Sequence, residues 1–245
     1  MTRAALVTGG AKRLGAAFAR ALAADGWRVV IHYGESREEA EALAAELDGA
    51  AVQADLSDLA HVPDLIARAA NAAGAPLAGL VNSASVFEHD TAADVGADSL
   101  TEHHAVNAAA PALLARAFAA QAPDGQDACV VNVLDQKLWS PNPDHLAYTM
   151  SKAALREHTR LAAQALAPVR VAGVAPGYCL PNPTESEASF EARAAKHNLL
   201  RRRLDPVHVA QAVAFALACP AITGSTILAD NGEHLVATDR DVVFT

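Results

Sequence analysis

The feature that most constrains the fold of this chain is a regular alternation of short β-branched segments with alanine-rich segments of helical periodicity. In the first helical segment, for example, Phe18 and Leu22 fall on one face. Strands that alternate with helices build right-handed βαβ units, so this order predicts a parallel sheet with helices on both faces. We expect strands at residues 4–7, 28–32, 51–54, 77–82, 129–134, 169–174 and 226–229, and helices at 15–25, 36–47, 62–73, 100–121, 147–166 and 207–218.

The length of the chain suits a single domain of this kind. Its 245 residues contain no internal repeat, low-complexity tract or linker, so we expect one domain over residues 1–245. This domain should be a Rossmann-type, doubly wound α/β fold with seven parallel strands. The least regular segment is residues 178–203, which contains Pro181 and Pro183. Long loops often cover a site, so we expect a substrate loop there.

Composition argues against several classes of partner. The net charge is −9, whereas a nucleic-acid partner usually needs a basic face, so we expect none. We interpret the cluster Arg201-Arg202-Arg203 as a solvated or subunit-contact surface rather than an anion site. No apolar run reaches the ~18 residues of a membrane span, and the N-terminal apolar stretch is too short for a signal peptide, which predicts a cytoplasmic protein without a membrane partner. The three cysteines lack metal-ligand spacing, so we expect no metal site.

A glycine-rich turn, residues 8–15, lies between the first predicted strand and the first predicted helix. Gly9, Gly10 and Gly15 would let the backbone approach a dinucleotide pyrophosphate at the helix N-terminus. Glycines also close ordinary connections between a strand and a helix, and the turn alone does not decide between these interpretations. Its position after the first strand favours a dinucleotide site.

The residues after the second strand indicate which dinucleotide binds. NAD enzymes usually place a carboxylate there, but this strand ends His32-Tyr33-Gly34. Arg13 in the turn, with Ser36 and Arg37 beyond the strand, could hold a 2′-phosphate, although Glu35 would repel it. We therefore predict NADPH.

Asp55 follows the third predicted strand and admits two interpretations. Its carboxylate could accept a hydrogen bond from the adenine amino group of the cofactor. Alternatively, Asp55 and Ser57 could simply cap the next turn. Spacing alone leaves both open.

Tyr148 and Lys152 lie four residues apart at the start of a predicted helix and therefore face the same way. A tyrosine near its free pKa of ~10 is a poor acid–base group at neutral pH, and a neighbouring ammonium would lower that pKa. Such pairs also occur on ordinary helix surfaces. Residues that end other predicted strands favour a reactive pair, because they mark the same edge of the sheet. They are Asn82-Ser83-Ala84-Ser85 after the fourth strand and Pro176-Gly177 after the sixth.

The segments TGGAKRLG, NSAS, YTMSK and PG, in this order, resemble the short-chain dehydrogenase/reductase family. That family binds NAD(P)H and uses a Tyr-x-x-x-Lys pair, a helper asparagine and usually a serine. By resemblance, Asn107, Tyr148 and Lys152 take these roles, with Asn107 holding a water that links Lys152 to solvent. The family forms dimers and tetramers, which implies a homo-oligomer, with a homotetramer favoured.

One departure from the family is informative. The serine usually lies thirteen positions before the tyrosine, where this chain has Asp135. An aspartate there resembles the pteridine reductase and dihydromonapterin reductase branch, as do the Lys12–Gly15 turn, the His32-Tyr33 pair and Phe87. In that branch Phe87 would stack on a pterin and Asp135 would hydrogen-bond its ring nitrogens. Phe87 could instead be a core aromatic, and Asp135 a turn cap.

The resemblance implies NADPH-dependent reduction of a dihydropterin or an oxidised pterin to the tetrahydro level. One alternative is a reductase of another carbonyl, such as a 3-oxoacyl thioester, and a second is a non-catalytic NADP-binding regulator. The expected substrate contacts are Arg13, Ser85, Phe87, Asp135 and Tyr148. The expected cofactor contacts are Gly9, Arg13, Leu14, His32, Tyr33, Ser36, Asp55, Leu56, Asn82, Ala84, Ser85, Tyr148, Lys152, Pro176 and Gly177.

Overall fold

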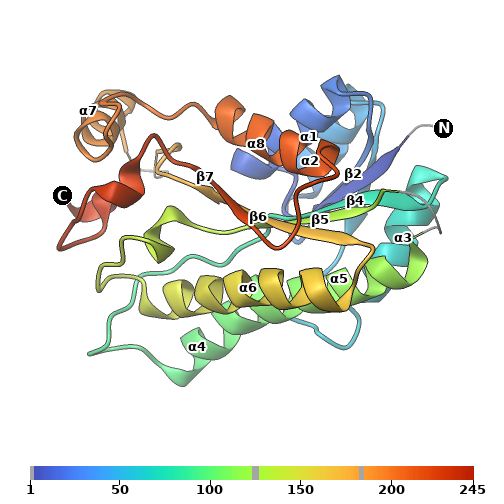
Figure 1. Ribbon diagram of the computed structural model, residues 1–245, viewed down its shortest axis with the longest axis horizontal. Helices are drawn as coiled ribbons and strands as arrows, with labels where there is room; N and C mark the ends of the chain where they lie inside the picture. The colour runs from blue at the N-terminus through green and yellow to red at the C-terminus, as the bar shows by residue number, and fades with distance from the viewer. Residues whose placement is uncertain (1–2, 123–126, 182–184) are drawn as a thin grey trace.

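The computed structural model describes residues 3–122, 127–181 and 185–245. In this part of the chain, seven strands form one sheet in the order β3-β2-β1-β4-β5-β6-β7, and every neighbouring pair is parallel (Figure 1). The predicted Rossmann-type, doubly wound sheet is therefore confirmed. The strands are β1 (Ala4–Val7), β2 (Arg28–Tyr33), β3 (Ala50–Gln53), β4 (Leu77–Asn82), β5 (Cys129–Val133), β6 (Arg170–Pro176) and β7 (Thr226–Ala229).

Helices cover both faces of the sheet. On one face, α1, α2 and α8 bury side chains such as Phe18, Leu43 and Val213, and on the other, α3, α5 and α6 bury Leu65 and Phe118 among others. Because both faces are covered, β1, β4, β5 and β6 are buried along their whole length. The helices are α1 (Arg13–Ala24), α2 (Arg37–Glu46), α3 (Asp64–Ala73), α4 (Ala97–His104), α5 (Ala110–Gln121), α6 (Leu146–Ala165), α7 (Glu187–Lys196) and α8 (Pro206–Ala218).

Two expectations need correction. The helix predicted over 100–121 is divided into α4, a π-helical turn at Ala105–Ala109, and α5. The predicted loop 178–203 contains the helix α7, whose N-cap Ser186 accepts a hydrogen bond from the Ser189 amide. Only Phe190 and Ala194 of α7 are buried, so the helix shows little apolar periodicity in the sequence. Pro183, which was part of the loop argument, lies outside the described residues.

The carboxyl ends of the strands meet at one edge of the sheet, on the left in Figure 1, where α7 and the C-terminal residues also lie. After β7 the chain forms two short 3₁₀ turns, η3 (Glu233–Leu235) and η4 (Val242–Phe244), and ends beside the N-terminus of α6. Open α/β sheets bind their ligands at this edge. In the described residues, none of the helices is both long enough and apolar enough to cross a membrane.

Candidate active site

A cavity of about 940 Å³ opens at the carboxyl edge of the sheet. A volume of this size is typical of a site for small molecules or cofactors. Most of the residues singled out from the sequence line it. They are Gly9, Arg13, Leu14, His32, Asp55, Leu56, Ala84, Ser85, Phe87, Asp135, Tyr148, Lys152, Pro176 and Gly177.

Four of the singled-out residues do not line the cavity. Tyr33 is buried in the core beneath α2, and Ser36 precedes α2 without a side-chain capping bond. Asn82 is buried and donates to Asn132 Oδ1 at 2.8 Å. Asn107 is fully buried in the π-helical turn. Tyr33, Asn82 and Asn107 therefore lie behind the cavity wall, and Ser36 lies beyond it.

The turn after β1 is shaped by its glycines and by His32. Gly9 has φ +60°, and a Cβ on Gly15 would lie 2.1 Å from the Gly9 carbonyl oxygen, so neither position has room for a side chain. Gly9 N–H donates to His32 Nδ1 at 3.1 Å, and His32 Nε2 lies 3.1 Å from the Ala54 carbonyl oxygen. Burial lowers the pKa of His32 to about 4, so the ring is neutral and joins the turn to the end of β3.

Charged residues surround this turn. Lys12 Nζ pairs with Glu39 at 2.6 Å, and Arg13 Nη1 donates to the Pro181 carbonyl oxygen at 3.1 Å. Lys12, Arg13 and Glu35 all line the cavity, whereas Arg37 pairs with Glu41 along α2. The sequence analysis missed Lys12, although it stands beside Arg13 in the same turn. Two cations therefore border this end of the cavity.

Asp55 caps the turn that follows β3. Its Oδ1 accepts hydrogen bonds from the Ser57 amide at 2.8 Å and the Ser57 hydroxyl at 2.7 Å, which lower the pKa of Asp55. The capping interpretation is therefore confirmed. The contact with an adenine amino group stays a prediction, which the position of Asp55 in the cavity lining permits.

Tyr148 and Asp135 form the centre of the site. The Tyr148 hydroxyl donates to Asp135 Oδ2 at 2.7 Å, while Asp135 Oδ1 accepts from the Lys137 amide at 2.8 Å and caps the short 3₁₀ turn η2 (Gln136–Leu138). The turn-cap interpretation of Asp135 is thus correct for one oxygen. The second oxygen is free to bind the phenol, because the turn presents it to the N-terminal end of α6.

The expectation that Lys152 lowers the pKa of Tyr148 is wrong. Burial raises the pKa of Tyr148 well above its ordinary value, and the charge of Asp135 raises it further. Lys152 Nζ donates to the Val133 carbonyl oxygen at 2.9 Å and lies 5.7 Å from the Tyr148 ring centroid, so the carboxylate is the nearer charge. Tyr148 is therefore a neutral phenol, suited to donate a proton rather than to accept one.

Burial also shifts the pKa values of the neighbours of Tyr148. It raises the pKa of Asp135, which favours the protonated carboxylic acid. It lowers the pKa of Lys152 to about 8, because the ammonium loses its hydration. Tyr148 is thus a neutral phenol, Asp135 is a carboxyl group that can retain a proton, and Lys152 is an amine that can lose its proton near neutral pH.

Asn107 supports the site from behind. Its Oδ1 accepts from the Val86 amide at 2.8 Å, and its Nδ2 donates to the Val86 carbonyl oxygen at 2.9 Å and to Ser151 Oγ at 3.0 Å. The expected water link from Asn107 to Lys152 stays a prediction. The contacts of Asn107 fix the loop after β4 to α6, and the π-helical turn that carries Asn107 is a feature often found at functional sites.

Phe87 is not a core aromatic, because 47% of it is exposed. Its ring stacks on His145 with 4.2 Å between centroids and meets the Tyr148 ring edge-on at 4.7 Å. Phe87 also lines the cavity. An aromatic face is therefore available directly beside the reactive phenol.

The end of the chain supplies groups that the sequence analysis missed. Glu233 Oε1 accepts from Gln136 Nε2 at 3.0 Å, and its Oε2 accepts from the Tyr178 amide at 2.7 Å. Burial raises the pKa of Glu233 to about 8, with smaller contributions from nearby carboxylates. Glu233 and Asp241 line the cavity together with Asp135. The lining of the cavity therefore includes these carboxyl groups as well as the cations Lys12 and Arg13.

Comparison with known proteins gives concordant results. A family model described as enoyl-(acyl carrier protein) reductase, a short-chain dehydrogenase/reductase model, matches residues 9–234. Pteridine reductase 1 from Leishmania tarentolae is 34% identical, covering 94% of this chain and 96% of its own. The structure of FolM alternative dihydrofolate reductase 1 from Brucella canis, complexed with NADP, superposes with a TM-score of 0.90 at 37% identity, covering 98% of this chain and 96% of that one. The 3-oxoacyl-[acyl-carrier-protein] reductase FabG from Staphylococcus aureus is 28% identical, covering 96% of this chain and 99% of its own.

Proposed function

The chain belongs to the short-chain dehydrogenase/reductase family, and from this premise we propose that it is an NADPH-dependent reductase of pterins. The observation that carries the proposal is the 2.7 Å hydrogen bond from the Tyr148 hydroxyl to Asp135, in a cavity that Phe87 also lines. The pteridine reductase and the FolM reductase named above support the same substrate class.

The residues of the turn after β1 fit a dinucleotide. A Cβ on Gly9 would lie 2.9 Å from Ala84 Cα, and one on Gly10 would lie 2.9 Å from the Val7 carbonyl oxygen, so only glycine lets this turn pack closely at the N-terminus of α1, where Gly9 lines the cavity. The N-terminus of α1 would hold the pyrophosphate, and Lys12 with Arg13 would hold a 2′-phosphate. When bound, the reduced nicotinamide would supply the hydride. Lys152 would hold the adjacent ribose.

The reactive groups would then deliver protons to the substrate. A pterin ring accepts hydride at a carbon of its C=N bond, and the neighbouring nitrogen needs a proton. Tyr148 is the proton donor, because its phenol is neutral and lies at the cavity surface. Asp135, whose pKa is raised by burial, returns a proton to the phenolate through their shared hydrogen bond. The phenol and the carboxyl group thus act as one proton-transfer unit.

The charge distribution supports a pterin over a carbonyl substrate. Asp135, Glu233 and Asp241 line the cavity together with Tyr148 and Phe87. A pterin presents amino and ring N–H donors, which carboxyl groups accept. A ketone or thioester carbonyl presents only an acceptor, so it offers these carboxyl groups no hydrogen-bond donor. The carboxyl groups therefore favour a donor-rich ring over the 3-oxoacyl alternative.

The test compares substrates and variants with purified protein. We expect NADPH oxidation with dihydrobiopterin or dihydromonapterin, with lower kcat/KM for 3-oxoacyl thioesters and for a ketone panel. Asp135→Ser, which restores the usual family residue, should lower kcat/KM for the pterin by about a hundredfold and spare ketone reduction. Asp25→Ser, at an exposed residue after α1, is the matched control. Absence of pterin turnover in the wild type would refute the proposed substrate.

Tyr148→Phe distinguishes an enzyme from a non-catalytic regulator. This variant should keep NADPH binding and lose turnover, whereas a regulator would keep its biological effect. We further propose a cytoplasmic homotetramer, which light scattering of the purified protein and fractionation of cells would test.

A further inference from the structure

Residues 236–245, here called the C-terminal strap, return to the cavity after β7, and Asp241, Val242 and Val243 line it together with Tyr148. We propose that the strap forms the wall of the substrate end of the cavity and that Val242 and Val243 determine which substrates enter. The identity of the substrate rests on the proposed function, but the position of the wall does not.

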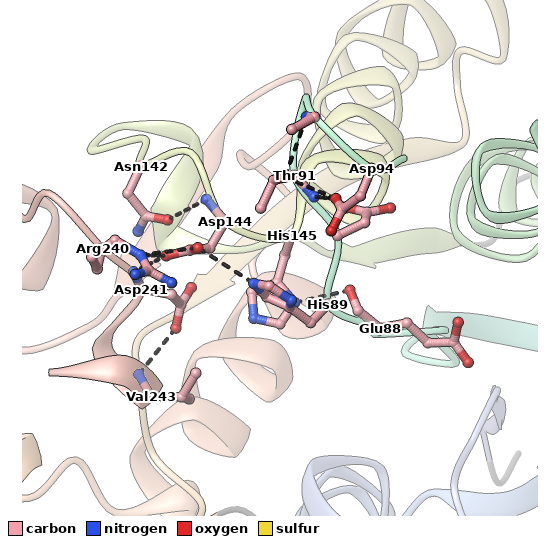
Figure 2. Close-up of polar contacts among 12 residues, drawn as sticks. Glu88, His89, Thr91, Asp94, Asn142, Asp144, His145, Arg240, Asp241 and Val243 are labelled. Atoms are coloured by element: carbon pink, nitrogen blue, oxygen red, sulfur yellow. Dashed lines mark hydrogen bonds and ion pairs between the residues drawn. The ribbon is translucent and has the colours of Figure 1, made fainter. Parts of the chain in front are cut away.

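The first anchor of the strap is the carboxylate of Asp144, in the loop before α6. Arg240 Nε lies 2.8 Å from Asp144 Oδ2 and 3.1 Å from Oδ1, and the Asp241 amide donates to Oδ2 at 2.8 Å (Figure 2). Only 2% of the Asp144 side chain is exposed. Arg240 holds the pKa of Asp144 far below its ordinary range, so the carboxylate stays ionised at neutral pH.

The second anchor is the buried ammonium of Lys137. Its Nζ donates to Asp241 Oδ2 at 3.1 Å and to the Asp144 carbonyl oxygen at 2.5 Å. The backbone amide of Lys137 donates to Asp135 Oδ1. One residue of η2 thus holds both the strap and the carboxyl group that binds the Tyr148 hydroxyl.

The third anchor is α7, the helix inside the predicted substrate loop. Arg193 Nη1 donates to the Val243 carbonyl oxygen at 3.3 Å, and Thr245 Oγ1 lies 2.8 Å from His197 Nε2. The strap therefore joins α7 to the loop before the catalytic helix. Val242 and Val243 lie between these two attachments.

A row of aromatic rings connects the strap to Tyr148. The Phe244 ring lies 4.8 Å from His89 and stacks on His145 at 5.9 Å, and His145 also stacks on Phe87. Phe87 in turn touches Tyr148. The ring contacts thus connect the strap that carries Val242 and Val243 to Phe87 and Tyr148, between which the substrate ring would lie under the proposed function.

The side chains of Val242 and Val243 suit a rigid wall. Both are branched at Cβ and hold few rotamers, and both are only partly buried, so they present apolar surface to the cavity. A larger side chain at either position would fill space that the substrate needs. The adenosine end of the cofactor site would be unaffected, because its residues come from β1, β2, β3 and the turns after them.

The test uses steady-state kinetics of the full chain with NADPH and dihydrobiopterin. Val243→Trp and Val242→Trp should raise the pterin KM about tenfold or more, with the NADPH KM changed less than about twofold. Val207→Trp, at an exposed valine on α8, is the matched control and should leave both values unchanged. Circular dichroism and thermal unfolding establish that each variant is folded.

A second variant tests the anchor without filling the cavity. Asp144→Asn keeps the size of the side chain and removes the charge that binds Arg240, so it should raise the pterin KM and expose the strap to limited proteolysis after Arg240. Suppose that the wild type reduces pterins but the pterin KM is unchanged in Val242→Trp, Val243→Trp and Asp144→Asn. This result overturns the strap proposal and leaves the proposed function standing. If the wild type reduces a ketone instead, the proposed function fails and the same KM comparison with that ketone decides on the strap. If it neither binds nor reduces any of these compounds, both proposals fail.

Discussion

Replacing Glu233 by glutamine should change how the stability of the protein depends on pH. Glu233 is 8% exposed, and its two oxygens accept hydrogen bonds from Gln136 Nε2 and the Tyr178 amide. Gln136 Oε1 is buried and has no partner among the described residues. If the side-chain amide of Gln136 flips by about 180°, this oxygen can accept a hydrogen bond from a donor at position 233. A protonated Glu233 or a glutamine at this position therefore keeps its hydrogen bonds with Gln136 and with the Tyr178 amide.

The magnitude follows from the pKa of Glu233. Burial raises this pKa from 4.5 to about 8, and the charges of Asp135, Asp230 and Asp241 add to the shift. Between these values the folded state binds more protons than the unfolded state, so the free energy of unfolding of the wild type falls as pH rises. Each pH unit costs about 1.4 kcal/mol, which sets a ceiling of about 5 kcal/mol across the window. Glutamine does not titrate and removes this loss.

Urea unfolding of the two proteins at several pH values measures the effect. The free energy of unfolding of Glu233→Gln, minus that of the wild type, should rise by more than about 1.5 kcal/mol between about pH 5 and about pH 8. Glu46→Gln is the control, because Glu46 is exposed and its pKa is lowered by Arg20, so its difference should stay flat over the same range. A flat difference for Glu233→Gln would refute the reasoning, since it would mean that Glu233 is ionised in the folded protein across the window.

Three further predictions concern the cofactor and the proton-transfer groups. The pKa of Lys152, lowered to about 8, predicts that kcat/KM falls as pH rises through that value, because the ammonium loses its charge, and a pH profile that stays level to about pH 10 would contradict this. Gly15→Ala should abolish NADPH binding in a fluorescence titration and lower the melting temperature, because its Cβ would lie 2.1 Å from the Gly9 carbonyl oxygen. Lys12→Ala should raise the KM for NADPH about tenfold and leave the KM for NADH unchanged, since only the former carries a 2′-phosphate. Equal changes in both would show that Lys12 has no part in choosing the cofactor.

The sequence predicted every strand of the sheet within two residues at each end. Each strand is a short apolar segment with a turn or a helix boundary on either side. The residues of the segment and of its boundaries are therefore enough to predict where the strand begins and ends. The π-helical turn that carries Asn107 was not predictable, because one extra residue per turn leaves the apolar pattern of residues 100–121 almost unchanged. The same limit applies to α7, where only Phe190 and Ala194 are buried and the sequence therefore shows little apolar periodicity.

Prediction of the site succeeded where residues follow a strand and failed where tertiary contacts decide. Asp135 and Phe87 follow β5 and β4, so the topology alone brings them to the carboxyl edge. Asp241 reaches Asp144 across 97 residues, and no local pattern in the sequence announces that contact. The pKa of Tyr148 was predicted with the wrong sign, because a neighbouring lysine is visible in the sequence and complete burial is not.

The short turn η2 links the two halves of the proposed pocket. Asp135 caps this turn and Gln136 donates to Glu233, while the side chain of Lys137 donates to Asp241 and to the Asp144 carbonyl oxygen. The proton-transfer groups and the strap are therefore built on one element, and moving either moves the hydrogen bonds of the other. In a serine-type member of the family, the residue before this turn would carry a hydroxyl, which can both donate and accept. Under the proposed function, a donor-rich ring held against Val242 and Val243 would offer hydrogen-bond donors to the carboxyl groups of this site, whereas a bare carbonyl would offer none.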